Sequence, residues 1–226
     1  MAAKIASKSG LAVVLSRLSV FQRPKVRVEQ YPTDSEIAAE VLWSAFMKGD
    51  IDNMVIADLG CGTGILGIGA LLLGAKKVYF LDIDQNALET SKNNILYLKS
   101  EGYFGNITKE RDFVLKCIDI KEASGFIENE MSRGMLSKIN TVLQNPPFGT
   151  RIKHIDKVFL EVAIDLAGII YTFHKSSTEN FVKALCHTSK VRITDILRFD
   201  FPLKKSIEHH RKKIQKIKVS CFRIET

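Results

Sequence analysis

The sequence has few cysteines, and no two of them stand close together. They are Cys61, Cys117, Cys186 and Cys221. No C-x-x-C pair is therefore present to form a zinc or thiol redox site, and we expect free thiols in a reducing compartment. The adjacent His209 and His210 have no acidic or cysteine companion at ligand spacing, so we expect no metal site.

Long hydrophobic runs are also absent. No stretch approaches the length of a transmembrane helix. The apolar run 11–15 is soon followed by Arg17 and lacks a convincing small-residue cleavage site, so it indicates an amphipathic helix and not a signal peptide. We expect a soluble intracellular protein without a membrane partner, in the cytoplasm or, in a eukaryote, also in the nucleus or nucleolus.

Acidic residues are outnumbered by basic ones. The chain has 33 Lys and Arg, 25 Asp and Glu, a formal charge of +8 and a pI near 9.3. This balance favours a polyanionic partner, above all nucleic acid. The length and the 46% of hydrophobic residues suit one globular unit. We expect an α/β core over 51–226, preceded over 1–50 by a helical segment and a loop that could cover a ligand.

A glycine-rich turn follows the apolar strand pattern 55–59 and precedes a helical pattern that begins at Ile65. Gly60 and Gly62 remove side chains that would block a ligand, and Gly64 allows close packing where the helix begins. The helix start also offers unpaired amides to an electron-rich group. Dinucleotide-binding domains use a related turn, so this motif does not decide the ligand by itself.

Acidic residues follow two further predicted strands. The strand 77–82 ends at Asp82, about twenty residues beyond the glycines, where a carboxylate can accept the hydroxyl hydrogens of a ribose. Asp84 is the competing candidate, or else the N-cap of a helix over 85–99. Asp119, after a strand over 112–118, could reach the base amine of the same cofactor or be an ordinary loop residue.

The segment Asn145-Pro146-Pro147-Phe148 follows the apolar run 139–143. Its prolines force the backbone out of the sheet in a stiff turn. An amide and an aromatic ring presented there can hold a planar ring that carries an amine, although the alternative is a proline-rich loop with a buried Phe.

Other candidates surround these motifs. The loop 30–33 is either the capping segment of the next helix or a lid. The strand ending at His174 places that residue either in a hydrogen bond at the strand end or near a substrate. Two closing strands, 191–201 and 217–224, favour an antiparallel hairpin with a basic loop. Residues that could contact substrate phosphates are Arg151, Lys153, Lys175 and Lys212.

Taken together, Asp58 to Gly64, Asp82 and Asn145 to Phe148 resemble a class I S-adenosylmethionine-dependent amino-methyltransferase. The segments 29–33, 145–150 and 174–178 further resemble the methyltransferase-like protein 5 family, which methylates adenine N6 in small-subunit ribosomal RNA. The resemblance implies an α/β, Rossmann-like fold whose seven-stranded, mostly parallel sheet ends in a C-terminal antiparallel hairpin.

The resemblance also implies roles for single residues. Gln30 and Thr33 match a cofactor-contacting segment, and the cofactor loop runs from Asp58. Asp82 matches the ribose acid and Asp119 the adenine-end acid, although Ile118 separates Cys117 from Asp119 where the family has an adjacent pair. The side-chain oxygen of Asn145 and the carbonyl of Pro146 would accept amine hydrogens while Phe148 stacks on the base. The residues implied for cofactor binding and catalysis are Gln30, Thr33, Asp58, Gly60, Gly62, Gly64, Asp82, Asp119, Asn145, Pro146, Pro147 and Phe148.

The implied reaction is direct methyl transfer to an adenine that is single-stranded or flipped out of a duplex. The implied partners are RNA and a small zinc-binding activator subunit docked at the sheet edge, for which the strand 112–118 is the candidate. Protein glutamine N5-methylation, DNA adenine methylation and a non-catalytic role in RNA binding or ribosome assembly stay open as alternatives.

Overall fold

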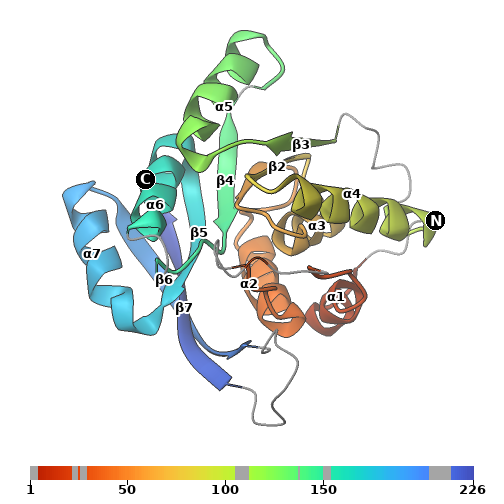
Figure 1. Ribbon diagram of the computed structural model, residues 1–226, viewed down its shortest axis with the longest axis horizontal. Helices are drawn as coiled ribbons and strands as arrows, with labels where there is room; N and C mark the ends of the chain where they lie inside the picture. The colour runs from red at the N-terminus through yellow and green to blue at the C-terminus, as the bar shows by residue number, and fades with distance from the viewer. Residues whose placement is uncertain are drawn as a thin grey trace.

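A seven-stranded sheet runs through the protein in the computed structural model, which describes residues 5–21, 25, 30–104, 112–136, 138–149, 154–203 and 215–226 (Figure 1). The strand order is β3-β2-β1-β4-β5-β7-β6. Strands β1 to β5 are mutually parallel, whereas β7 runs antiparallel to both β5 and β6. The predicted fold class is thus confirmed. The strands are β1 Val55–Leu59, β2 Lys77–Asp82, β3 Phe113–Cys117, β4 Ile139–Gln144, β5 Ala167–Lys175, β6 Arg192–Leu203 and β7 Gln215–Glu225.

Helices cover both faces of the sheet. Successive residues of β1 alternate between two hydrophobic clusters, Ile56 in one and Val55 and Ala57 in the other, because neighbouring side chains of a strand point to opposite faces. The first cluster packs under α1 to α4 and the second under α5 to α7. The helices are α1 Lys8–Leu15, α2 Ser35–Met47, α3 Ile65–Leu72, α4 Gln85–Ser100, α5 Ala123–Ser132, α6 Ile155–Leu166 and α7 Glu179–Thr188, with short 3₁₀ turns η2 Ile120–Glu122 and η3 Ser176–Thr178.

The N-terminal helices belong to the same core as the sheet. Leu11 and Leu15 of α1 are buried in one cluster with Leu42 of α2 and Ile56 of β1. The apolar run near the N-terminus therefore forms a packed amphipathic helix, as predicted. The boundary at residue 50, between an N-terminal segment and the α/β core, stays a prediction. Within the described ranges, no helix is long and apolar enough to span a membrane.

Local polar groups explain where two helices begin. Asp34 accepts hydrogen bonds from the backbone N–H groups of Glu36 and Ile37 and so caps α2. Asp84 caps α4 through the N–H of Asn86. For Asp84, capping is one of the two roles that the sequence predicts. The sequence predicts no helix over 179–188, where the structure has α7.

A buried ion pair joins the end of the N-terminal segment to the C-terminal hairpin. Arg223 on β7 donates from Nε to Asp50 Oδ2 (2.8 Å) and from Nη2 to Asp50 Oδ1 (3.1 Å). Tyr171 on β5 donates from Oη to Asp50 Oδ2 at 2.6 Å. Burial, followed by the hydrogen bond to Asp50, raises the pKa of the Tyr171 phenol, so this hydroxyl stays a donor.

This arrangement predicts a large loss of stability in Arg223→Ala. The substitution leaves the Asp50 carboxylate buried without its cation, which typically costs about 3–5 kcal/mol. The matched control is Arg192→Ala, since the Arg192 side chain pairs with Glu225 but is 76% exposed, and exposed pairs contribute about 1 kcal/mol or less. Equilibrium unfolding in urea measures both variants. Equal losses in the two variants would contradict the assignment.

Candidate active site

The carboxyl ends of β1, β2 and β4 border a cleft with a volume of about 180 Å³. This is the edge at which open parallel sheets bind ligands. The cleft brings together most of the residues implied for cofactor binding and catalysis. Of that set, its lining includes Gln30, Thr33, Asp58, Gly60, Gly62, Asp82, Asp119, Asn145 and Pro147.

The backbone of the glycine turn adopts dihedral angles that favour glycine. Gly60, Gly62 and Gly64 all have positive φ, at 63°, 54° and 87°, a region that side chains disfavour. A Cβ atom on Gly62 would lie 2.8 Å from the ring of Phe21. At Gly64 a Cβ would collide with the Ser91 side chain on α4, so Gly64 packs between helices and does not line the cleft.

Asp82 holds the turn in place. The Gly62 N–H donates to its Oδ2 at 2.7 Å, and the Asp84 N–H donates to its Oδ1 at 2.8 Å. The Ile83 N–H also interacts with this carboxyl. Because each carboxylate oxygen has two acceptor positions, the carboxyl keeps room for a ligand hydroxyl. Burial raises the pKa of Asp82 above its usual value. The ribose role of Asp82 stays a prediction with which this geometry is compatible.

Asp84 serves as the helix cap and also as an anchor for the loop before α2. Lys25 Nζ donates to its Oδ1 at 2.8 Å and Gln30 Nε2 to its Oδ2 at 2.7 Å. Burial alone would raise the pKa of Asp84, but the hydrogen bonds from Lys25, Gln30 and Asn86 lower it. Asp84 does not line the cleft, so its capping role is the one that the structure shows.

Thr33, at the other end of the same loop, contacts the turn 145–148 that follows β4. Asn145 Nδ2 donates to Thr33 Oγ1 at 2.9 Å. The loop 30–33 is therefore fixed at Gln30 to the start of α4 and at Thr33 to the turn after β4. Asp119 also lines the cleft and caps η2 by accepting from the Lys121 N–H at 3.0 Å. Its adenine-end role stays a prediction.

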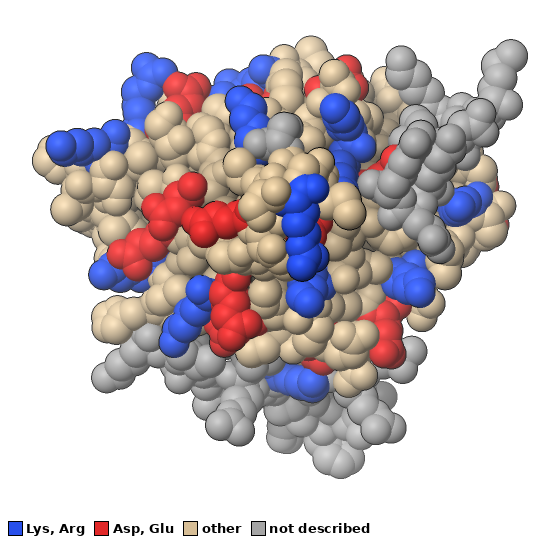
Figure 2. Space-filling view, turned by 90° about the horizontal axis from the view of Figure 1, so that it is seen from above, with Lys and Arg blue, Asp and Glu red and all other residues tan. Residues whose placement is uncertain are grey.

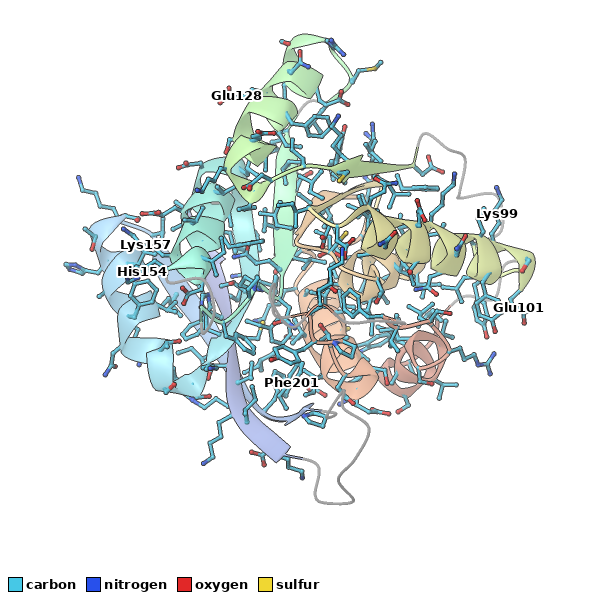
Figure 3. The ribbon with its side chains drawn as sticks, in the orientation of Figure 1. Lys99, Glu101, Glu128, His154, Lys157 and Phe201 are labelled. Carbon is cyan, nitrogen blue, oxygen red and sulfur yellow. The ribbon has the colours of Figure 1, made fainter. Side chains whose placement is uncertain are left out.

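A second, smaller hollow adjoins the turn 145–148. Its volume is about 10 Å³, which is room for roughly one water-sized group. Asn145 borders it, and Asn145 Oδ1 is a buried acceptor without a partner among the described residues. Lys175 Nζ lies 5.9 Å from the centroid of the Phe148 ring. Phe201, labelled in Figure 3, is a residue of β6 and belongs to the same hydrophobic cluster as Leu42 of α2. The residues that line the hollow are Tyr31, Asn145, Pro146, Phe148 and Phe201.

The position of His174 favours the hydrogen-bonded alternative over contact with a substrate. This residue is 1% exposed, so it does not lie where a substrate would contact it. Its Nε2 is 2.9 Å from Thr172 Oγ1, which in turn accepts from Gln144 Nε2 at 2.9 Å. Burial lowers the pKa of His174 to about 4, so the imidazole is neutral at physiological pH. Of the predicted phosphate contacts, Lys175 is described, whereas Arg151, Lys153 and Lys212 lie outside the described residues.

The apolar walls of the cleft were missed by the sequence analysis. Phe21 covers Gly62, and Phe159 from α6 covers Gly60. Phe21 is placed by Asn94 of α4, whose amide binds the backbone of Ser19 through N–H and carbonyl groups and also the Thr63 carbonyl. A buried Asn in a helix gives no sequence signal for this bridge.

In the part of the chain that the structure describes, no three His, Cys, Asp or Glu residues cluster as metal ligands.

Known proteins resemble this chain over nearly its whole length. The rRNA N(6)-adenosine-methyltransferase METTL5 of Danio rerio is 33% identical, with 92% of this chain and 94% of that protein covered. The chain belongs to the METTL5 family. An uncharacterised protein of Methanocaldococcus jannaschii is 37% identical over 96% of this chain and 94% of its own. A family model described as ribosomal protein L11 methyltransferase (PrmA) matches residues 41–116.

A solved structure shares the fold of this METTL5 family member. The crystal structure of PH1948 from Pyrococcus horikoshii, a proposed RNA methyltransferase, superposes with a TM-score of 0.79 at 32% identity and covers 97% of this chain and 98% of that chain. The agreement over both chains includes the N-terminal helices and the C-terminal hairpin, so the cleft lies within the shared architecture.

S-adenosylmethionine is the cofactor of the METTL5 family, and the cleft fits this group. The cofactor carries a sulfonium and an ammonium against one carboxylate, so it is a net cation, and the cleft contains the carboxyl groups of Asp58 and Asp82. Gly60 and Gly62 leave backbone accessible, and Phe21 and Phe159 supply apolar walls. These residues would hold the cofactor.

Asp58 is the most perturbed acid of the cleft. The Gly67 N–H donates to its Oδ2 at 2.8 Å. Burial raises the pKa of Asp58 to about 7; the Gly67 hydrogen bond opposes this rise, and the nearby Asp82 adds to it. The carboxyl is therefore largely protonated in the folded protein below neutral pH.

This pKa predicts a stability that falls as pH rises. The folded pKa of Asp58 lies above its unfolded value of about 3.9, so the folded state binds the proton more tightly than the unfolded state does. Proton binding by Asp58 therefore stabilises the fold fully below about pH 4, and this stabilisation, at most about 4 kcal/mol, is lost between about pH 4 and pH 7. Asp58→Asn keeps an acceptor for Gly67 without the ionisation. We take the free energy of unfolding of Asp58→Asn minus that of wild type. This difference should be larger at pH 8 than at pH 5. A difference that does not change with pH would contradict this.

Proposed function

We propose that this METTL5 family member transfers a methyl group to the N6 amine of an adenosine in ribosomal RNA. The observation that carries the proposal is Asn145, whose buried Oδ1 has no partner among the described residues and lies where the cofactor cleft adjoins a hollow of amine size. The sequence similarity to an rRNA N(6)-adenosine-methyltransferase supports RNA as the substrate, and so does the formal charge of +8.

The chain contributes binding and orientation. Bound S-adenosylmethionine supplies an electrophilic methyl group. Thr33 accepts from Asn145 Nδ2, which fixes the amide so that Oδ1 is left to accept a hydrogen from the substrate amine. Phe148 offers its ring to the base, with Lys175 beside it. Such positioning accounts for a large share of the rate in reactions between two bound groups.

The finer substrate proposal is small-subunit ribosomal RNA, with the target adenosine unpaired or flipped out so that its amine can enter the hollow. Protein glutamine and DNA adenine are the competing substrates. A ribosomal RNA substrate would place the reaction in the cytoplasm or, in a eukaryote, in the nucleus or nucleolus.

Mass spectrometry of nucleosides from ribosomal RNA tests the proposal. Cells that lack the protein should lose one N6-methyladenosine, wild-type protein should restore it, and Asn145→Ala should not. With purified protein, Asn145→Ala should lower the methylation rate by about a hundred-fold or more, because one positioned polar contact can contribute several kcal/mol at the transition state. Its cofactor affinity should change little.

The control for this experiment is Asn129→Ala, an exposed amide on α5 remote from the cleft, which should behave as wild type. Labelled methyl incorporation into plasmid DNA and release factor is assayed beside ribosomal RNA. Transfer to either of these and none to RNA would overturn the proposal, as would an Asn145→Ala variant with the wild-type rate.

We also propose that a small zinc-binding activator subunit pairs with β3. This strand is at the end of the strand order. The Ile118 N–H donates to Asp82 O and the Val78 N–H to Asp112 O, so by alternation the backbone groups of Phe113, Leu115 and Cys117 point away from β2. On the face seen in Figure 2, the basic and acidic side chains of the described residues are intermixed.

Cys117→Pro tests this edge directly. Proline removes the outward N–H at an exposed position, which an edge strand tolerates, whereas Cys117→Ala keeps that donor. We expect Cys117→Ala to co-elute with the host's activator in size-exclusion chromatography and Cys117→Pro to elute alone while retaining its thermal stability. Co-elution of both variants would refute pairing at β3, and a wild-type protein that is fully active and elutes alone in the presence of the activator would refute the partner.

A further inference from the structure

Tyr31 stands at the junction of the two hollows. Of the described residues, Tyr31 and Asn145 alone line both the cofactor cleft and the small hollow beside the catalytic turn. The side chain of Tyr31 is 38% exposed, so the ring is not a core residue. No motif in the sequence analysis gives this residue a role.

The backbone on both sides of Tyr31 is fixed. Gln30 donates to Asp84, the N-cap of α4, and Thr33 accepts from Asn145. Pro32 restricts the backbone between them, and Asp34 begins α2. The backbone thus fixes the position of an aromatic ring that remains exposed. Such a ring is available to contact a ligand.

We propose that the Tyr31 ring is a contact for the target adenine and forms the wall of the base site on the cofactor side. This inference rests on the proposed function. The hollow has room for about one water-sized group, so the amine edge of the base enters it and the rest of the purine stays outside. Tyr31 then lies beside the protruding base, while Phe201, 1% exposed, forms part of the buried lining.

The ring, and not the hydroxyl, performs this role. A planar apolar face stacks on a base regardless of any hydrogen bond. In addition, Tyr31 separates the base from the rest of the cleft, so it limits how far the amine can move away from Asn145. Loss of the ring therefore weakens both base binding and its orientation.

The test compares Tyr31→Ala, Tyr31→Phe and the matched control Tyr97→Ala, which removes a tyrosine that is 40% exposed on α4. The substrate is small-subunit ribosomal RNA from cells that lack the protein. Tyr31→Ala should lower kcat/KM for RNA by about ten-fold or more, with a much smaller change in the cofactor dissociation constant measured by calorimetry. Tyr31→Phe should recover most of the loss.

Urea unfolding of each variant separates this role from a structural one, and we expect the midpoint of Tyr31→Ala to match that of Tyr97→Ala. Tyr31→Ala with the activity of Tyr97→Ala would overturn the inference alone. So would a loss confined to cofactor affinity, or a loss that Tyr31→Phe does not recover. A wild-type protein that methylates no ribosomal RNA would overturn the proposed function and this inference with it.

Discussion

The register of the parallel strands is the constraint on which the site depends. Leu59 at the end of β1 pairs with Leu81 on β2 and with Gln144 on β4. The next residue along each strand therefore emerges at the same level of the same edge. A slip of one residue in either pairing would turn the side chains that follow to the other face and separate the cofactor turn from the catalytic turn. The three residues brought level in this way are Gly60, Asp82 and Asn145.

Features set by this register could be predicted from the sequence. Strand ends marked by glycine, acid or proline are local signals, and they give the fold class, the glycine turn and the position of Asn145. The depth at which His174 is buried could not be predicted, because the neighbouring strand is remote in sequence: β7 continues to pair with β5 as far as Lys175, with His174 opposite Ser220. A residue expected at the strand's exposed end thus lies inside the sheet.

Contacts between distant segments could not be predicted. Asp50 and Arg223 are 173 residues apart, and neither has a neighbour in sequence that indicates an ion pair. The Asn94 bridge to Ser19 and Thr63 likewise depends on three separate segments that meet only in the folded protein. These contacts place an apolar wall of the cleft and close the hairpin onto the core, so the sequence predicts the reacting groups better than their supports.

The loop 30–33 makes the cofactor side and the base side of the site interdependent. Its Gln30 end is bonded to Asp84, next to the acid that holds the glycine turn, and its Thr33 end is bonded to Asn145. Because both ends of the loop are bonded, a ligand that shifts the loop at one end also shifts the group bonded at the other end. Coupling of this kind is reciprocal. A cofactor that favours the loop position suited to the base would favour binding of the base, and the base would favour binding of the cofactor to the same extent.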